Sequence, residues 1–174
     1  MVKKDEAVRF YENMRSHYAT YYNNKEIAAW AGLVLYVLFC SLIIGSSLPT
    51  EHEGITAALL FIAVLGVTYT VFVYIRNQLT MRDIGGATCS AALLIQSEIL
   101  LSDKTDFSEY IIVVESSDCK AQSSHALPSF LIQKRDLMNA KGRGFQDASR
   151  LSIYSLMAVS IFSVILLKYV SLLG

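Results

Sequence analysis

Residues that could do chemistry are few in this chain, and they are scattered. The three histidines, His17, His52 and His125, have no nucleophile or second metal ligand at a useful spacing. The sequence has no phosphate-binding glycine loop, no dinucleotide glycine fingerprint, no H-E-x-x-H zinc motif and no G-x-S-x-G nucleophile motif. We therefore expect a protein that is not an enzyme, with no catalytic, cofactor or metal site.

Small and hydroxyl side chains inside three long apolar stretches are more informative. In the third stretch, at about 100° per residue, five serines fall within about 160° of one another: Ser152, Ser155, Ser160, Ser163 and Ser171. The second stretch would carry on one helix side Thr56, Ala63, Gly66, Thr70 and Tyr74, and the first opens with Ala28-x-x-x-Gly32. Small residues let membrane helices approach closely, and hydroxyls can hydrogen-bond across the contact. Two interpretations stay open: packing of the spans within one monomer, or a face directed at a subunit interface or a water-filled lumen.

Three apolar stretches must position these residues. Residues 27–48 and 55–75 contain no Asp, Glu, Lys, Arg or His, and at 22 and 21 residues each could cross a hydrocarbon core of about 30 Å as a helix. The short break between them makes the pair a membrane hairpin. Residues 151–173 contain one charge, Lys168, near enough to the far end to reach the interface. The expected fold is an all-α integral membrane protein with three transmembrane helices.

The distribution of Lys and Arg predicts the orientation of these spans. The break at residues 49–54 has none, whereas every Lys and Arg except Lys168 lies in residues 1–26 or 76–150. By the positive-inside rule the N-terminus and a small helical region at 76–150 are cytosolic, and the C-terminus is outside. A fourth span at 84–101 would bury Gln96 and Glu98 and move the basic residues that follow to the outside. We therefore predict that 84–101 is a cytosolic helix or lies on the membrane.

Basic residues next to the predicted spans could also bind ligands. They are first of all determinants of topology. A binding role for anionic lipid headgroups, or for a phosphorylated ligand beside a hinge at residues 142–144, is the second interpretation. The candidates for that role are Lys141, Arg143 and Arg150.

The remaining segments predict helices and one loop. Residues 3–26 form an amphipathic helix crowded with aromatic side chains, which suits either an interfacial anchor or a docking surface for another protein. Asp106 and Glu109 have the spacing of a capping box that opens a helix through residue 114. A polar loop follows at 116–126, and then a helix between Pro128 and Gly142.

Composition agrees with a membrane protein. The chain has 174 residues, of which 53% are hydrophobic and 17% charged, against about 25% charged in ordinary soluble domains. The formal net charge is zero, so we expect no nucleic-acid partner. The cysteines, Cys40, Cys89 and Cys119, form no C-x-x-C pair, so no zinc site or disulfide framework is predicted.

We expect four parts: a juxtamembrane helix at 1–26, the hairpin at 27–75, a cytosolic region at 76–150 and the third span at 151–174. In length and number of spans this architecture is similar to the small multi-span membrane effectors of bacterial phage-defence systems. That resemblance implies an inner-membrane, multi-pass protein that perturbs the membrane when its cytosolic part senses a signal.

The leading hypothesis is a non-enzymatic homo-oligomer of this kind, whose partners are the lipid bilayer and a cytosolic protein or small-molecule signal. A membrane-anchored scaffold or accessory subunit is the alternative, with Tyr18, Tyr21 and Tyr22 as its docking residues. A small channel or transport component is a third possibility.

Overall fold

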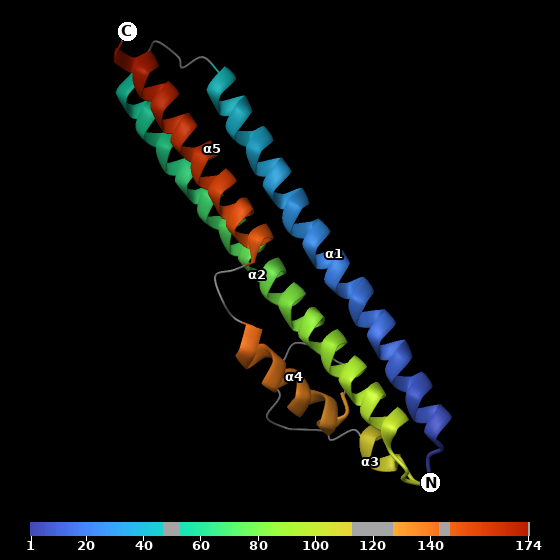
Figure 1. Cartoon of the computed structure of the whole chain (residues 1–174). Helices are drawn as coiled ribbons and strands as arrows, with labels where there is room; N and C mark the ends of the chain where they lie inside the picture. The colour runs from blue at the N-terminus through green and yellow to red at the C-terminus, as the bar shows by residue number, and fades with distance from the viewer. Residues whose placement is uncertain (47–52, 113–126, 143–146, 174) are drawn as a thin grey trace. The chain divides into compact units, whose positions relative to one another are not determined.

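The computed structural model describes residues 1–46, 53–112, 127–142 and 147–173, and for residues 53, 139–142 and 169–173 the backbone alone. In these ranges the chain forms five α-helices (Figure 1). They are α1 (Lys4–Gly45), α2 (Glu53–Leu101), α3 (Ser108–Ile111), α4 (Ser129–Gly142) and α5 (Ala148–Leu173). The predicted all-α fold is therefore confirmed in its outline.

Three of these helices are long and apolar enough to cross a membrane: Lys4–Gly45, Gly54–Leu101 and Ala148–Lys168. The chain is accordingly a multi-pass membrane protein by helix length and composition. The sidedness predicted from the basic residues stays a prediction.

Two predicted boundaries are missing from the long helices. Residues 3–26 and the first apolar stretch were expected as two elements, but α1 runs through both without interruption. Similarly, α2 continues from the second apolar stretch through residues 84–101. A fourth crossing would need a turn before residue 84, and the helix has none there.

The chain divides into two compact units, which are described separately. The first, unit 1, consists of Met1–Asn24 and Met81–Arg143, and the second, unit 2, consists of Lys25–Thr80 and Gly144–Gly174. Both α1 and α2 contribute one part to each unit.

Unit 2 contains the apolar part of α1, the apolar part of α2, and α5. Its core is one buried cluster: Ala29, Leu33, Tyr36, Cys40, Val64, Ile75, Leu79, Ile153, Met157 and Val164. The four α1 members recur at intervals of three or four residues, the spacing of one helix face. The outward faces are also apolar, with Leu42, Ile62 and Phe162 among the exposed side chains. A bundle in water would show polar side chains there, so these faces suit contact with lipid.

One hydrogen bond between side chains joins α1 to α2 inside this cluster. The Thr68 hydroxyl donates to the Val64 carbonyl at 2.7 Å. Because that uses its one proton, the Tyr36 hydroxyl donates to Thr68 Oγ1, at 2.9 Å. Tyr36 is 1% exposed, so this bond lies within the bundle.

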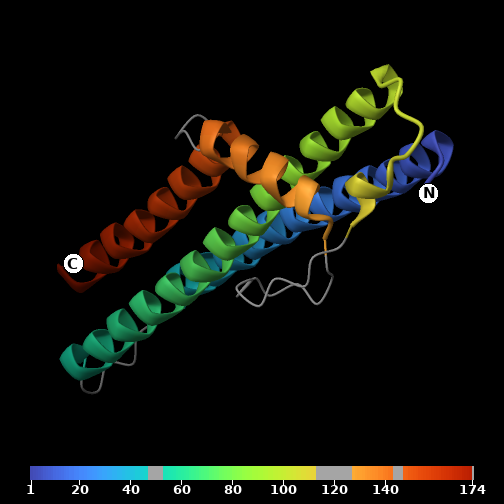
Figure 2. The same ribbon diagram turned by 90° about the horizontal axis from the view of Figure 1, so that it is seen from below.

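Unit 1 packs the first part of α1 and the last part of α2 with α3 and α4. Its buried cluster is Ala7, Tyr11, Ala91, Ala92, Ile95, Ile99, Phe107, Tyr110, Leu127 and Leu131. Three of these are alanines, which let the helices approach closely. At one end of the unit, the start of α1, the end of α2 and α3 come together (Figures 1 and 2). There the Tyr11 hydroxyl donates to the Tyr110 carbonyl at 2.5 Å.

Two adjacent glycines bring α2 against the tyrosines of α1 in unit 1. A Cβ added at Gly85 would lie 3.0 Å from Tyr21 Cδ1 and 3.5 Å from the Tyr22 backbone nitrogen. One added at Gly86 would lie 3.1 Å from Tyr22 Cδ2. Tyr21 and Tyr22 stay partly exposed, so the role of the aromatic residues at the membrane interface or in docking a partner stays a prediction.

The connection from α2 to α3 differs from its prediction. The capping box at Asp106 and Glu109 is wrong, because the residue that precedes α3 is Phe107, and no side chain caps that helix. Asp106 instead accepts from the backbone N–H of Val2, and Glu109 pairs with Lys104. The helix ends after one turn, at Ile111, and Ile112 is extended.

The predicted loop at 116–126 lies outside the described residues. Pro128 directly precedes α4, which begins at Ser129, and the Pro128 carbonyl accepts from the Ile132 N–H at 3.1 Å. Gly142 is the last residue of α4, whereas it was expected just beyond the end. The rest of the predicted hinge, residues 143 and 144, is outside the description.

The Tyr36–Thr68 bond predicts a stability difference between two tyrosines of the spans. Tyr36→Phe removes the donor and should lower the free energy of unfolding by about 0.6 kcal/mol, and by at most about 1.7 kcal/mol. Tyr69→Phe makes the same chemical change at a side chain that is 71% exposed, and should be close to neutral. Unfolding by titration with a denaturing detergent measures both, and equal losses would contradict the assignment.

The glycine contact predicts that Gly85→Val destabilises unit 1. The added methyls meet both a ring and backbone atoms, so we expect a loss of about 1–3 kcal/mol. Hydrogen exchange in residues 4–24 and 81–101 should then be about tenfold faster or more. Gly54→Val is the matched control, since nothing lies within 4 Å of a Cβ there and the residue is outside unit 1. Unchanged exchange in Gly85→Val would show that the helices do not need this close approach.

Candidate functional site

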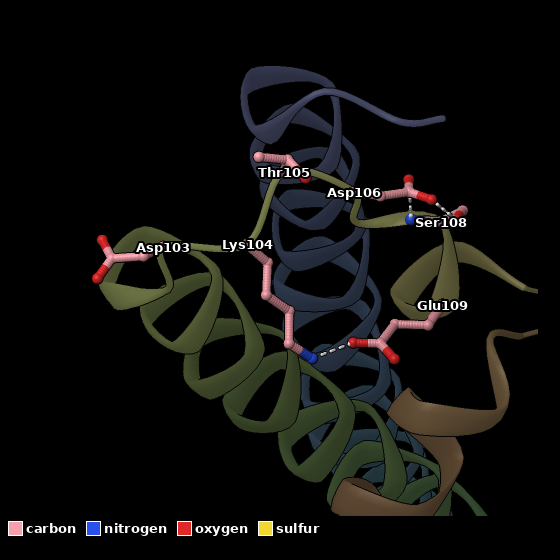
Figure 3. Close-up of a pocket in the computed structure, with 6 residues that line it drawn as sticks. All are labelled: Asp103, Lys104, Thr105, Asp106, Ser108 and Glu109. Atoms are coloured by element: carbon pink, nitrogen blue, oxygen red, sulfur yellow. Dashed lines mark hydrogen bonds and ion pairs between the residues drawn. The ribbon is translucent and has the colours of Figure 1, made fainter.

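A polar recess lies on unit 1 at the connection between α2 and α3 (Figure 3). It has a volume of about 440 Å³ and is lined by Asp103, Lys104, Thr105, Asp106, Ser108 and Glu109. In the figure Lys104 and Glu109 point toward each other, Asp106 points toward Ser108, and Asp103 points away. Sequence reasoning noticed Asp106 and Glu109 only as a helix cap.

The first residues of the chain hold this recess in place. The Val2 N–H donates to Asp106 Oδ1 at 2.9 Å, and the Val2 carbonyl accepts from the Phe107 N–H at 3.2 Å. The Lys4 ammonium donates to the carbonyls of Leu100 and Ser102, at 2.8 and 3.1 Å. The last carbonyls of a helix have no partner within it, and a cation is favourable beside them. Lys4 therefore caps α2 and fixes the start of the connection.

Two groups of the recess, Asp106 and Lys104, are stabilised in their charged forms. The Val2 N–H, and after it the Ser108 hydroxyl, lower the pKa of the Asp106 carboxyl. Glu109, whose carboxylate is 2.5 Å from the ammonium, raises the pKa of Lys104. Neither group is thereby moved toward neutral pH, where a proton donor or acceptor would work. The arrangement can bind a polar partner, but these two shifts do not prepare it for proton transfer.

No metal site is visible in the part of the chain that the structure describes, because no group of three or more His, Cys, Asp or Glu side chains comes together there. The lining of the recess includes three carboxylates, but Glu109 is paired with Lys104 and Asp106 with hydrogen-bond donors.

The serines predicted as one face of α5 lie outside the buried cluster of unit 2. The residues that α5 contributes to that cluster are Ile153, Met157 and Val164. Ser152 and Ser155 are exposed, and Ser160 and Ser163 are partly exposed. The last two donate to carbonyls of their own helix, Ser160 to Leu156 and Ser163 to Val159. The Ser171 side chain is outside the description.

Gly66 and Thr70 lie on an exposed face of α2. Nothing lies within 4 Å of a Cβ added at Gly66, and the Thr70 hydroxyl donates to the Gly66 carbonyl at 2.9 Å. Four further exposed residues continue this face along the helix at intervals of three and four. We call the set the α2 seam: Leu59, Ala63, Gly66, Thr70, Val73 and Asn77.

The other residues singled out in the sequence, two small residues of α1 and three basic residues, lie in different environments. A Cβ at Gly32 would lie 3.0 Å from Tyr74 Cε1, so this glycine is at a contact between α1 and α2, whereas Ala28 is partly buried. Arg150 is partly buried in the first turn of α5. The Lys141 side chain and Arg143 lie outside the description. A headgroup or phosphate role for the three basic residues stays a prediction.

Comparisons with protein-family models, with curated proteins and with solved structures give no match for this chain.

The contacts of Asp106 predict that the stability of the connection between α2 and α3 depends on pH. Because the folded carboxyl has a lowered pKa, its stabilising contacts are present above the unfolded value of about 3.9 and are lost as pH falls through the folded value. Hydrogen exchange in residues 102–111, corrected for intrinsic rates, should therefore accelerate below about pH 3.9. In Asp106→Asn it should already be faster at neutral pH and rise less in acid. Asp103→Asn changes an exposed carboxyl that points away from the contacts, and should behave like the unaltered chain.

Proposed function

We propose that this chain is a non-enzymatic membrane effector that acts as a homo-oligomer in a bacterial inner membrane. The N-terminus and residues 76–150 would be cytosolic and would receive a protein or small-molecule signal, which α5 would pass to the membrane. The single observation that carries the proposal is the α2 seam, an exposed face with small residues at its middle.

The spacing of the seam suits a second helix. Its members follow one another at intervals of four, three, four, three and four residues. This is the pattern of helices that cross at about +20°, as most membrane bundles do. Ala63, Gly66 and Thr70 occupy the middle, where a small side chain allows the closest approach. Leu59 and Val73 flank them, so apolar contacts would continue on both sides.

The neighbouring exposed side chains of α2 are large, which sets the seam apart. Ile62 is 65% exposed and Tyr69 is 71% exposed. Lipid chains can cover such a surface, whereas the open space at Gly66 between bulky neighbours suits the backbone of another helix. A second copy of α2 would present the same small residues, so the contact would be symmetric.

The exposed hydroxyl groups of α5 are the groups through which the assembly would perturb the membrane. Ser152 and Ser155 are exposed on the unit that carries the spans. In an assembly they would face a neighbouring subunit or a water-filled path, because either offers hydrogen-bond partners that lipid lacks. The phage-defence context rests on the resemblance in length and number of spans, and is part of the proposal.

The scaffold alternative has less support from the described residues. Tyr21 and Tyr22 contact Gly85 and Gly86 of their own chain and are only partly exposed, so less of the two rings is open to a partner. The polar recess is another surface, but two of its three acidic groups, Asp106 and Glu109, already accept from donors of the same chain.

The proposal predicts that Gly66→Ile separates the subunits. An isoleucine in the middle of the seam should prevent close approach, whereas Ala58→Ile, on an exposed part of α2 outside the seam, should not. Cross-linking and mass measurement in nanodiscs should find an oligomer for the unaltered chain and for Ala58→Ile, and a monomer for Gly66→Ile. An unaltered chain that is monomeric in nanodiscs and in several mild detergents would refute the proposal.

The same variants predict effects in cells. Controlled expression of the unaltered chain should depolarise the inner membrane, and both Gly66→Ile and the pair Ser155→Leu/Ser163→Leu should abolish this. A potential-sensitive dye and a dye-entry assay measure the outcome, with neighbouring genes present to supply an activating signal. An intact potential under all of these conditions would favour the scaffold alternative.

A further inference from the structure

Helices α1 and α5 are joined by a polar contact at each end of the apolar part of unit 2. At one end the Ser149 hydroxyl donates to Glu26 Oε1 at 2.9 Å. At the other end the Lys168 ammonium donates to the Ser46 carbonyl, directly after the last residue of α1. Both residue pairs belong to unit 2.

The two contacts fit helices of equal length that run in the same direction. From Glu26 to Ser46 is 20 residues, and from Ser149 to Lys168 is 19. At 1.5 Å per residue these separations are about 30 and about 28 Å. Both match the thickness of a hydrocarbon core, about 30 Å. Each contact therefore falls where the core would meet its headgroup layer.

Apolar packing holds α5 only weakly between these ends. Ile153, Met157 and Val164 are buried, whereas most of the large apolar side chains of the helix, including Leu151, Val159 and Phe162, are exposed. In a bilayer such packing gains little, because lipid chains are as apolar as the neighbouring helix. The polar end contacts therefore have a large share in fixing α5 along α1.

Both end contacts can be exchanged for others at modest cost. A lysine near the end of a span can extend its ammonium into the headgroup layer. The Glu26 carboxylate and the Ser149 hydroxyl can take water or headgroup partners in the same way. The free energy is therefore similar whether these groups contact each other or contact water and headgroups. This suits a helix, α5, that can occupy two positions.

We propose that these two contacts form a reversible lock that holds α5 against α1 in the resting state, and that opening the lock lets α5 move during activation. The activating consequence rests on the proposed function, whereas the lock itself does not. The device concerns the position of the third span, and it leaves the α2 seam unchanged.

The test compares substitutions at Lys168 by a distance measurement. Spin labels are placed at Leu42→Cys on α1 and Leu166→Cys on α5, both exposed, with Cys40, Cys89 and Cys119 replaced by Ala. In nanodiscs, with the labelled chain diluted in unlabelled chain so that distances between copies do not contribute, the otherwise unaltered chain should give one narrow distribution. Lys168→Met should add a population displaced by about 5 Å, one helical turn, or more. Lys168→Arg keeps the donors and should resemble the unaltered chain.

A lysine outside the spans provides the matched control. Lys134 forms an ion pair with Glu98 in unit 1, so Lys134→Met makes the same change of side chain and charge without removing either contact of the lock. It should leave the α1–α5 distance unchanged. If Lys168→Met does not fold, Ser149→Ala opens the other end, with labels at Ile27→Cys and Leu151→Cys. Unchanged distances in Ser149→Ala and in any folded Lys168→Met would overturn the lock.

Membrane potential separates this proposal from the proposed function. If Lys168→Met shifts the distance and also hastens depolarisation, the lock and its role in activation both stand. A shifted distance with no depolarisation by any variant would keep the lock and refute the effector function. Depolarisation by the unaltered chain together with unshifted distances would refute the lock alone.

Discussion

In a bilayer, an apolar side chain gains little free energy by moving from lipid to a contact with another helix. Polar contacts therefore contribute an unusually large part of the free energy that fixes the helices of a membrane protein relative to one another. The ends of the two long helices show this most directly. Lys4, at the start of α1, caps the last carbonyls of α2, and Lys168 of α5 donates to the carbonyl that follows α1. Each lysine supplies a partner that the helix end lacks. Since each comes from a different helix, the same bond also joins two elements.

The lengths of α1 and α2 explain why one helix needs two kinds of surface. At 42 and 49 residues they are about 63 and about 74 Å long, roughly twice the hydrocarbon thickness. Neither can lie wholly within the bilayer as a crossing helix. In unit 2 the exposed residues of both helices are mostly apolar, whereas in unit 1 Lys4, Tyr11 and Glu98 use polar contacts. One continuous helix thus meets lipid along one part and can meet water along another.

The spans could be predicted because a long apolar stretch without charged residues indicates a membrane helix, whatever residues surround it in the folded protein. The contacts of unit 1 could not, because they join residues far apart. The capping box is wrong because Phe107, and not Asp106, directly precedes α3, while Asp106 also accepts from Val2, about a hundred positions away. Gly85 and Gly86 likewise make room for Tyr21 and Tyr22, which lie far earlier in the chain. For the candidate site, periodicity grouped the hydroxyls on one face, but the direction of that face depends on which helices cover α5.

The α2 seam and the α5 lock use different parts of unit 2, and this permits two separate steps. Gly66 is two residues beyond the buried Val64, and Thr70 is five before the buried Ile75. At about 100° per residue, both lie about 140–160° around the helix from the buried side. A second copy could therefore contact the seam without displacing the core, and the lock joins α1 to α5 rather than to α2. Assembly and release of α5 need not compete, so copies could gather at rest and respond together when a signal opens the lock.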